Sequence, residues 1–389
     1  MNKIKVLHLI NTLKPGGAEA NLVNLVKAAD KARFEIHVGY SFGGPLEETL
    51  AREGVALYKF AGKEHKVKSF ASFLIVKRLA SYISKNKINI VHTHSFNTHV
   101  WGSLAARLGG AKVVEHVHDP RYEEESYLLS RGALKTRQFD WAKRFAKLSD
   151  TIVVLTQRNR EYLLRHSICA DSKIKVLLNG IFLDQGTART SALEKFSIPA
   201  EKKVVLTALR LSKEKNAAFI IDIVSKLNER HKDCVFVIAG DGPERKELEE
   251  KVRKNGWVDK ILFTGYQPDV RGLLGSSDIF ILPTFRELHS IAMIEAMSAG
   301  VPVLVSKGAG CNDDFIRHGM NGYLLDPRNP EEWTRTIGTL LDNPDLAKKV
   351  GKAGRELVER ECDIRKTIKN IEKVYETVIA NVVRRRRTW

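Results

Sequence analysis

The sequence has few of the features that mark membrane-spanning or metal-chelating proteins. No apolar run of 18 residues occurs in the 389-residue chain, so we expect no segment to span a membrane. The four cysteines are scattered and form no CxxC pair, which excludes a cysteine-built zinc site and is typical of a reducing compartment. A GxGxxG motif is also absent, which argues against NAD as a cofactor.

Acidic residues are in deficit. The chain has 46 Asp and Glu residues against 64 Lys and Arg residues, which gives a formal net charge of +18. This excess predicts an anionic partner, and nucleic acid, anionic lipid and phosphorylated substrates all satisfy that condition. No recognised nucleic-acid-binding motif accompanies the charge, so nucleic-acid binding is an alternative that depends on charge alone.

Short β-branched runs alternate with helical stretches along the chain. The N-terminal run begins like a signal peptide, but His8 and Asn11 interrupt it and no cleavage site follows, so we interpret it as a strand. The predicted strands are 4–10, 34–40, 55–60, 88–94, 111–118, 150–156, 174–180, 203–210, 234–242, 261–265, 279–284, 301–306 and 322–326. Several are continuously apolar, as parallel strands buried on both faces are.

Thirteen strands exceed one ordinary sheet. We therefore predict an α/β protein of two Rossmann-like, doubly wound domains that face each other across a cleft. The first would comprise residues 1–181 and the second residues 182–364, and residues 365–389 would form a helix and basic tail that pack back on the first domain. Ligands of such sheets bind beyond the carboxyl ends of the strands, so the loops there are the candidate sites.

Basic amphipathic stretches predict contact with an anionic membrane surface. Two helical stretches, 67–87 and 132–150, mix aromatic and aliphatic residues with lysine and arginine, and the chain ends in an arginine run at 384–387. Each stretch alone is equally consistent with an ordinary surface helix. Because all three occur in one strongly basic chain, we expect membrane association.

Two loops carry residues suited to a diphosphate. Gly16 and Gly17 form a tight turn into a helix, where a phosphate can approach the backbone beside the positive helix terminus. Arg210 and Lys215 follow the first strand of the second domain and could clamp a diphosphate, with Lys213 as an alternative to Lys215.

A pair of glutamates brackets the start of a predicted helix. Glu287 lies in a loop and Glu295 lies in a helix expected from about Ser290 to Ala299, which Gly300 ends and Pro302 cannot continue. The helix amides could hold a phosphate while the two carboxylates hold hydroxyl groups. Taken alone, the pair is better explained by a loop acid near a helix dipole and an exposed helix acid.

The ordered motif series resembles glycosyltransferase family four, whose members have the GT-B fold. The motifs, from Gly16 to about Asp326, are GGAE, NGI, LRLSKEKN, AGDGPE, FTG, DIFILPTFRELHSIAMIEAMSAGVPV and NGYLLD. Their order and spacing are similar to those of the family. The resemblance therefore covers nearly the whole chain.

The resemblance implies a nucleotide-sugar donor, with UDP as the expected carrier, held by the second domain. Arg210 and Lys215 would neutralise the leaving diphosphate. Glu287 would hold the transferred sugar, and Glu295 would accept hydrogen bonds from the ribose. His118, in VEHVHD, would face the donor sugar from the acceptor domain. The other implied donor-binding residues are Gly16, Gly17, Asn179, Gly240, Ser290, Ile291 and Ala292.

Family members retain the anomeric configuration and need no metal, so the resemblance implies no cofactor. The chain departs from the family at Leu209 and Leu288, where glycine is usual, and at 311–314, where a Gly/Pro–Glu pattern is more common. The identity of the sugar is therefore not predicted.

Four histidines raise a separate possibility of zinc. His92 and His94 share one strand face, as do His116 and His118, and converging imidazoles can bind zinc. No carboxylate or thiol completes an evident site, and polar residues at adjacent strand ends explain the pattern. We expect no metal here.

The sequence thus predicts a retaining glycosyltransferase that moves a sugar to a hydroxyl group of a lipid-linked or surface-glycan acceptor, in polysaccharide or glycolipid biosynthesis. Its partners would be the donor, the acceptor and an anionic membrane, at the inner, cytoplasmic face of the cell membrane. A nucleotide-sugar epimerase or a phosphorylase on the same scaffold is the alternative.

Overall fold

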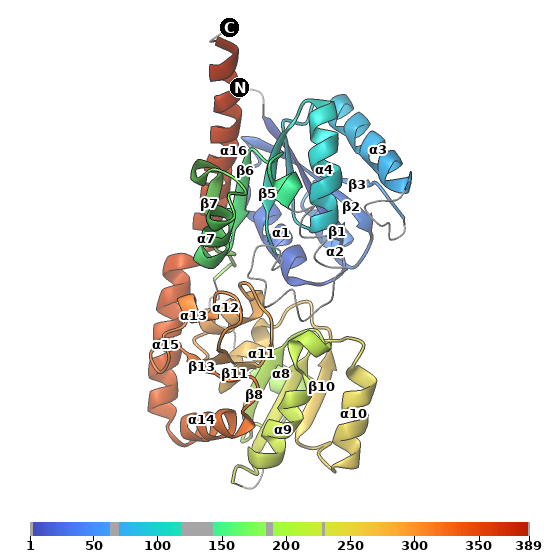
Figure 1. The fold of residues 1–389 in the computed structure, drawn as a ribbon. Coiled ribbons are helices and arrows are strands. Elements are labelled where there is room, and N and C mark those ends of the chain that lie inside the picture. The colour runs from blue at the N-terminus through green and yellow to red at the C-terminus, as the bar shows by residue number, and fades with distance from the viewer. Residues whose placement is uncertain (1–2, 63–69, 119–142, 184–189, 228–229, 388–389) are drawn as a thin grey trace. The chain divides into compact units, whose positions relative to one another are not determined.

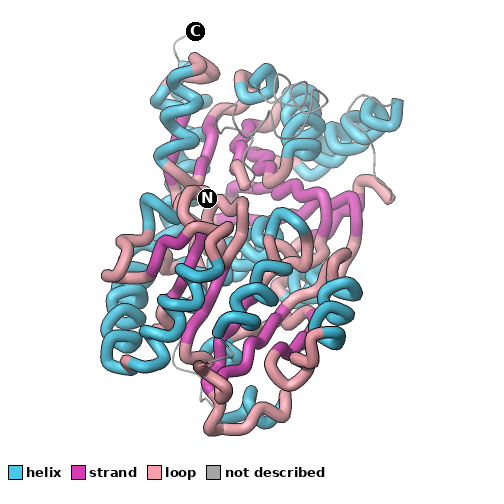
Figure 2. The backbone as a smooth tube through the Cα atoms, turned by 60° about the horizontal axis from the view of Figure 1, so that its bottom comes forward, coloured by secondary structure: helices cyan, strands magenta, loops and turns pink. Residues whose placement is uncertain are grey.

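The computed structural model describes residues 3–62, 70–118, 143–183, 190–227 and 230–387 (Figure 1). The chain divides into two compact units, of which the first comprises Met1–Gly180 with Ile364–Trp389 and the second comprises Ile181–Asp363. Each unit is built on one sheet, and in each unit the strands lie between helices (Figure 2). These are the two parallel α/β domains that the strand–helix alternation predicts.

The first unit contains a seven-stranded sheet in the order β3-β2-β1-β4-β5-β6-β7. All neighbouring strands are parallel. Its strands are β1 (Ile4–Thr12), β2 (Phe34–Phe42), β3 (Ala56–Lys59), β4 (Ile90–Thr93), β5 (Lys112–His116), β6 (Thr151–Val154) and β7 (Ile174–Val176). The strand order reverses between β1 and β4, and crevices at such reversals are where doubly wound sheets bind ligands.

Alternating residues of these strands fill two cores. Val6 and Ile10 of β1 pack with helix α1 (Gly17–Ala28) and with Ile371 of α16 (Ile364–Arg387). Leu7 and Leu9 face the opposite side, with α3 (Phe70–Asn86) and α4 (Phe96–Gly109). The other described helices of this unit are α2 (Leu46–Arg52), α7 (Gln157–Arg165) and the 3-10 helix η1 (Asp171–Lys173).

The second unit contains a six-stranded sheet in the order β10-β9-β8-β11-β12-β13, again with parallel neighbours. Its strands are β8 (Lys203–Ala208), β9 (Cys234–Ala239), β10 (Ile261–Gly265), β11 (Ile279–Leu282), β12 (Val303–Ser306) and β13 (Tyr323–Leu325). Here the order reverses between β8 and β11. The loops after these two strands are therefore the candidate site of this unit.

Helices cover this second sheet. They are α8 (Thr190–Lys195), η2 (Lys213–Lys215), α9 (Ala218–Leu227), α10 (Arg245–Lys254), α11 (Arg271–Gly275), α12 (Ile291–Ser298), α13 (Asn312–Phe315), α14 (Pro330–Asp342) and α15 (Pro344–Glu361). Helices α9 and α14 meet through Phe219 and the buried Trp333, whose ring centroids lie 5.8 Å apart. The Trp333 indole also donates a hydrogen bond of 2.8 Å to the Asp326 carbonyl, which satisfies its one donor.

The basic stretches can be followed only in part. The predicted helix 67–87 corresponds to α3, whereas residues 67–69 and most of the predicted helix 132–150 lie outside the described residues. The backbone of the arginine run 384–387 continues α16, but its side chains lie outside what the structure describes. No helix in the described part of the chain is long and apolar enough to cross a membrane.

Candidate functional site

The loops after β8 and β11 meet through an ion pair. Lys215 Nζ lies 2.8 Å from Glu287 Oε2, and both side chains are mostly shielded from solvent. The same ammonium group lies 3.4 Å from the Arg286 carbonyl oxygen. The neighbouring Lys213 is exposed, so of the two candidate lysines the structure places Lys215 beside the predicted sugar-binding glutamate.

Asn216 holds the two loops in place. Its backbone is in the left-handed region with φ +56°, which Asn tolerates better than most residues. Its side-chain amide donates 3.0 Å hydrogen bonds to the carbonyls of Pro283 and Pro327. A backbone hydrogen bond of 3.1 Å from Phe285 to Glu214 ties the loops again. Lys215 is thus presented by a fixed backbone.

Helix α12 begins at the expected place. Ser290 is its N-cap and accepts a hydrogen bond of 3.3 Å from the Met293 amide, leaving the amides of Ile291 and Ala292 in the first turn. Glu295 lies one turn further along. Burial raises the pKa of Glu295 to about 7; Asp269 adds to the rise and Arg271 opposes it. Near neutral pH this carboxyl group exists in both protonation states.

Gly240 has a packing role. Its φ is +151°, and a Cβ atom there would lie 1.8 Å from the Leu209 carbonyl oxygen. Two backbone hydrogen bonds of 3.0 Å extend the β8–β9 pairing past the strand ends. The Leu209 amide donates to the Ala239 carbonyl and the Leu211 amide to the Asp241 carbonyl. The glycine therefore allows the loop after β9 to lie directly on the loop that carries Arg210, whose side chain is exposed.

The two leucines that replace family glycines are both buried, Leu209 at 9% and Leu288 at 5% exposure. The Leu288 carbonyl accepts a 2.8 Å hydrogen bond from the Cys311 amide. A Cβ atom at Gly310 would lie 1.7 Å from the Glu287 carbonyl oxygen. Loop 308–311 therefore packs against the backbone of Glu287 and Leu288.

The glycine turn of the first unit is open at one position. Gly16 is the N-cap of α1 and Gly17 its first residue, and a Cβ atom at Gly17 would meet nothing within 4 Å. A Cβ atom at Gly16 would lie 2.3 Å from a carboxylate oxygen of Glu19. Burial raises the pKa of Glu19 to about 7, and a hydrogen bond from its own backbone amide opposes part of this rise. Gly17 leaves room for a phosphate, and Glu19 is a titratable neighbour of that space.

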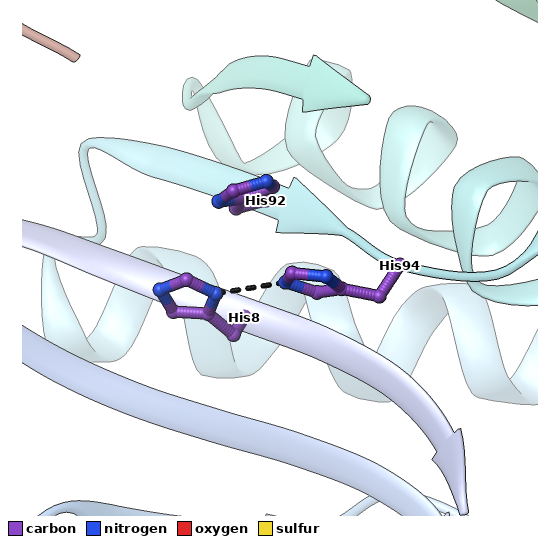
Figure 3. A group of neighbouring side chains, drawn as sticks. All are labelled: His8, His92 and His94. Carbon is purple, nitrogen blue, oxygen red and sulfur yellow. Dashed lines mark hydrogen bonds between the residues drawn. The ribbon is translucent and has the colours of Figure 1, made fainter. Parts of the chain in front are cut away.

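Five histidines gather on three neighbouring strands. His8 lies within β1, His92 and His116 lie in β4 and β5, and His94 and His118 follow the carboxyl ends of those two strands. His94 Nε2 lies 2.9 Å from His8 Nδ1 (Figure 3). On its other side, His94 Nδ1 lies 3.1 Å from His118 Nε2. His92 pairs with His8 in the β1–β4 register and stacks on His94, with ring centroids 4.4 Å apart and planes inclined by 28°. His116 is the fifth, at 4.1 Å from the His118 ring. Burial is the main cause that lowers the pKa values of His8, to about 3, and of His92, His94 and His116.

Two groups of these histidines are close enough to hold a metal ion, His8 with His92 and His94, and His94 with His116 and His118. The ligand atoms within each group lie within 4.8 Å of one another. Zinc must lie in the plane of each ring at about 2.0–2.1 Å from a nitrogen. His94, which belongs to both groups, has its two ring nitrogens in contact with His8 and His118, so a metal ion would have to displace those contacts.

Asn179 is buried in the first unit, and the next residue shows why its segment is fixed. The Gly180 carbonyl accepts a 3.1 Å hydrogen bond from the Asn24 side chain of α1. A Cβ atom at Gly180 would lie 2.6 Å from Thr367 Oγ1 of α16. Gly180 therefore lies between α1 and α16.

Three residues near these sites escape the sequence analysis. His8 and Glu19 appear as a lone strand histidine and an ordinary helix acid, and Tyr375 lies in a helix far along the chain. The Tyr375 hydroxyl lies 2.6 Å from His92 Nδ1 and 3.5 Å from His8 Nε2. His8 could be found only from the topology. The first strand of a doubly wound sheet is central, so it lies beside the strand that carries His92 and His94.

Two family models match the chain. Glycosyltransferase Family 4 matches residues 15–185, and Glycosyl transferases group 1 matches residues 188–357, so that together they match most of the chain.

Individual proteins agree with these matches. The chain is 25% identical over 391 residues to UDP-Gal:alpha-D-GlcNAc-diphosphoundecaprenol alpha-1,3-galactosyltransferase of Escherichia coli, with 98% of each protein covered. It is 26% identical over 373 residues to N-acetyl-alpha-D-glucosaminyl L-malate synthase of Bacillus anthracis, with 94% of each covered. The crystal structure of HepE from Anabaena with UDP and glucose superposes with a TM-score of 0.81 at 20% identity, covering 96% of this chain and 99% of that one. The chain therefore belongs to glycosyltransferase family four and has the GT-B fold.

Proposed function

We propose that the chain is a retaining glycosyltransferase that transfers a sugar from a UDP-sugar to a hydroxyl group of a lipid-linked acceptor. The observation that carries the proposal is the Lys215–Glu287 pair, 2.8 Å apart, at the strand-order reversal of the second sheet. The pair places a cation that can bind phosphate next to a carboxylate that can bind sugar hydroxyl groups. The E. coli relative named above uses a UDP-sugar and an undecaprenol-linked acceptor, which supports both substrate classes.

The proposed chemistry is electrostatic. In glycosyl transfer from a nucleotide diphosphate, the leaving diphosphate gains negative charge as the bond to the sugar breaks. Arg210 and Lys215 stabilise that charge, and the amides of Ser290, Ile291 and Ala292 at the start of α12 add hydrogen bonds to phosphate oxygens. Because these groups supply positive charge, we propose that no metal ion is needed. Glu287 holds the sugar and Glu295 the ribose.

The remaining roles are proposed on the family match. In the first unit, His118 acts on the donor sugar and Gly16 and Gly17 admit the diphosphate to the helix terminus. Asn179 and Gly240 act through the backbone segments that they fix, since both lie where chain segments pack closely.

Replacing Lys215 tests the proposal. Lys215→Ala should lower kcat for sugar transfer from UDP-glucose or UDP-galactose by about 10²–10³-fold, the cost of removing one preorganised group that stabilises developing charge. Lys213→Ala is the matched control, because it removes an exposed lysine two residues away in the same turn. Equal activity of the two variants would refute the assignment.

Two further measurements address the mechanism. The anomeric configuration of the product, read by NMR, should equal that of the donor, and an inverted product would exclude a retaining reaction. Activity should survive treatment with EDTA followed by dialysis, and a loss restored only by added metal would contradict metal independence.

We also propose that the enzyme works on the cytoplasmic face of a membrane. Helix α3 exposes Phe73 and Leu74, at 54% and 45%, and Lys77 Nζ lies 4.6 Å from the Phe73 ring centroid. Exposed aromatic and basic residues on one helix can bind anionic lipid, at about 1 kcal/mol per basic residue. An acceptor with a lipid carrier would be reached from such a surface.

Vesicle co-sedimentation tests this surface. Replacing Lys77, Arg78 and Lys85 by Gln should weaken binding to vesicles of anionic lipid about 100-fold, from three losses of about 1 kcal/mol. The control replaces three exposed basic residues of α10: Lys251, Arg253 and Lys254. Deletion of 384–387 tests the arginine run separately. Unchanged binding by both the α3 variant and the deletion would refute membrane association through these groups.

A further inference from the structure

His116 is a buried histidine whose two ring nitrogens have no hydrogen-bond partner among the described residues. A neutral imidazole has one N–H donor and one acceptor nitrogen, and burying either of them unpaired costs free energy. By contrast, the neighbouring His94 uses both of its nitrogens, with His8 and with His118. The unpaired nitrogens of His116 therefore indicate a ligand that the described part of the chain does not itself supply.

Two neighbours of His116 carry nitrogens close enough to share an ion with it. Ligand atoms of His94, His116 and His118 all lie within 4.8 Å of one another. Zinc binds a histidine nitrogen at about 2.0–2.1 Å, so two nitrogens on one tetrahedral ion lie about 3.3 Å apart. His94 Nδ1 and His118 Nε2 are 3.1 Å apart. An ion would displace the hydrogen bond between these two nitrogens and replace it with two coordinate bonds, after only a small separation of the pair.

The position of this group in the sheet gives an ion a way in. His94 and His118 follow the carboxyl ends of β4 and β5, and His118 is partly exposed, whereas His94 and His116 are buried. The other group, His8 with His92 and His94, is buried throughout. A site with three histidines and one exposed side can take up an ion from solvent and leave the fourth position to water.

The outer contact of His94 also suits a metal ligand. Metal-binding histidines usually have a partner for the second ring nitrogen, which fixes the ring. His94 Nε2 has such a partner in His8 Nδ1, at 2.9 Å. Imidazole nitrogens bind zinc, copper and nickel well, whereas magnesium prefers oxygen ligands. A group of three imidazoles therefore selects transition-metal ions over Mg²⁺.

We propose that His94, His116 and His118 bind a divalent transition-metal ion such as Zn²⁺, and that the bound ion inhibits sugar transfer by holding His118 away from the donor sugar. The inhibitory part rests on the role given to His118 under the proposed function. The metal-free protein is then the active form, which agrees with transfer that needs no metal. The sequence alone predicts no metal here, and the unpaired nitrogens of His116 are what the structure adds.

Zinc content measures the site directly. The full-length protein, treated with EDTA and then dialysed against Zn²⁺, should retain stoichiometric zinc by elemental analysis, and Mg²⁺ should not compete for the site. His116→Gln should lose that zinc, because glutamine is polar and similar in size but has no imidazole nitrogen. His166→Gln is the matched control, since His166 is an exposed histidine of the same unit outside the cluster, and it should keep the zinc. If His116→Gln does not fold, His118→Gln gives the same measurement at a partly exposed position.

Transfer assays measure the inhibition. Saturating Zn²⁺ should lower kcat of the parent and of His166→Gln about 10-fold or more, the effect of losing one hydrogen bond in the transition state, and EDTA should restore it. His116→Gln should transfer sugar at the parental rate without zinc and should keep that rate when zinc is added.

Failure of this proposal can be told apart from failure of the proposed function. A parent that retains no zinc, or a His116→Gln variant that retains as much zinc as the parent, would overturn the metal site, and water would then be the partner of the unpaired nitrogens. Zinc that is lost in His116→Gln but does not slow transfer by the parent would overturn the inhibitory role. A parent that binds zinc as expected but transfers no sugar from any UDP-sugar would refute the proposed function and leave the metal site standing.

Discussion

Glu295 is a carboxyl group whose removal should stabilise the protein. Burial raises its pKa from 4.5 to about 7, with Asp269 adding to the rise and Arg271 opposing it. Between these pH values the folded protein keeps a proton that the unfolded chain has released. The free energy of unfolding therefore falls as pH rises from about 4.5 to 7, and above 7 the full cost of a buried charge is present.

The size of the effect follows from the shift. One pKa unit corresponds to about 1.4 kcal/mol, so the full cost is about 3 kcal/mol above pH 7 and under about 1 kcal/mol at pH 5. Glutamine has the same shape and does not titrate. Glu295→Gln should therefore exceed the parent in free energy of unfolding by about 2–3 kcal/mol at pH 8, and by less than about 1 kcal/mol at pH 5.

The same change should weaken the donor complex. A hydrogen bond to a charged group contributes about 1.5–3 kcal/mol, so Glu295→Gln should bind UDP-glucose about 10- to 100-fold more weakly at pH 8. The parent's affinity should rise between pH 6 and 8 as Glu295 ionises, and that of the variant should stay flat. UDP-glucose is the suitable probe because its diphosphate does not titrate in this range.

Urea denaturation at pH 5 and pH 8 and calorimetric titration with UDP-glucose measure both effects. Glu287→Gln is the control, because Lys215 lies 2.8 Å from Glu287 and compensates its charge, so this variant should gain no stability at pH 8. A Glu295→Gln variant that is less stable than the parent at pH 8, or that binds UDP-glucose equally well, would refute the reasoning.

Two other predictions concern the backbone of the second unit. Gly240→Ala should lower the melting temperature far more than Gly256→Ala. A Cβ atom at position 240 would lie 1.8 Å from the Leu209 carbonyl oxygen, whereas one at position 256 would meet nothing within 4 Å. Equal losses would show that the loops separate freely. Asn216→Ala should lower kcat by misplacing Lys215, and Asn216→Gly, which keeps the left-handed backbone, should lower it less; identical kcat values would mean that the hydrogen bonds alone hold the loop.

The strands could be predicted almost completely from the sequence. Each of the thirteen predicted strands has a counterpart, because continuous apolar runs are a strong signal for buried parallel strands. Several are shorter than predicted. Residues 92–94 and 116–118 continue the alternating pattern, but β4 ends at Thr93 and β5 at His116, since the chain leaves the sheet there.

The helix that carries Glu295 was also predictable. The sequence predicts it from about Ser290 to Ala299, and it runs over Ile291–Ser298 with Ser290 as its cap, because Ser and Gly mark helix ends reliably.

The contacts within the sites could be predicted only in part. The sequence identifies both Lys215 and Glu287 as residues that follow strands. Their pairing depends on the turn at Asn216, whose side chain bonds to Pro283 and Pro327, at 67 and 111 positions further along the chain. The Tyr375–His92 contact joins residues 283 positions apart, and no local pattern encodes such a distance.

The chain order of the two units has a consequence for how the protein is made. Helix α16 completes the core of the first unit with Ile368, Ile371 and Tyr375, yet it is translated after the whole of the second unit, 181–363. Domains generally fold as units during synthesis, N-terminal first. Here the first sheet emerges from the ribosome with one apolar face covered by α1 but not yet by α16, and that part of the face stays uncovered while the ribosome adds the entire second domain.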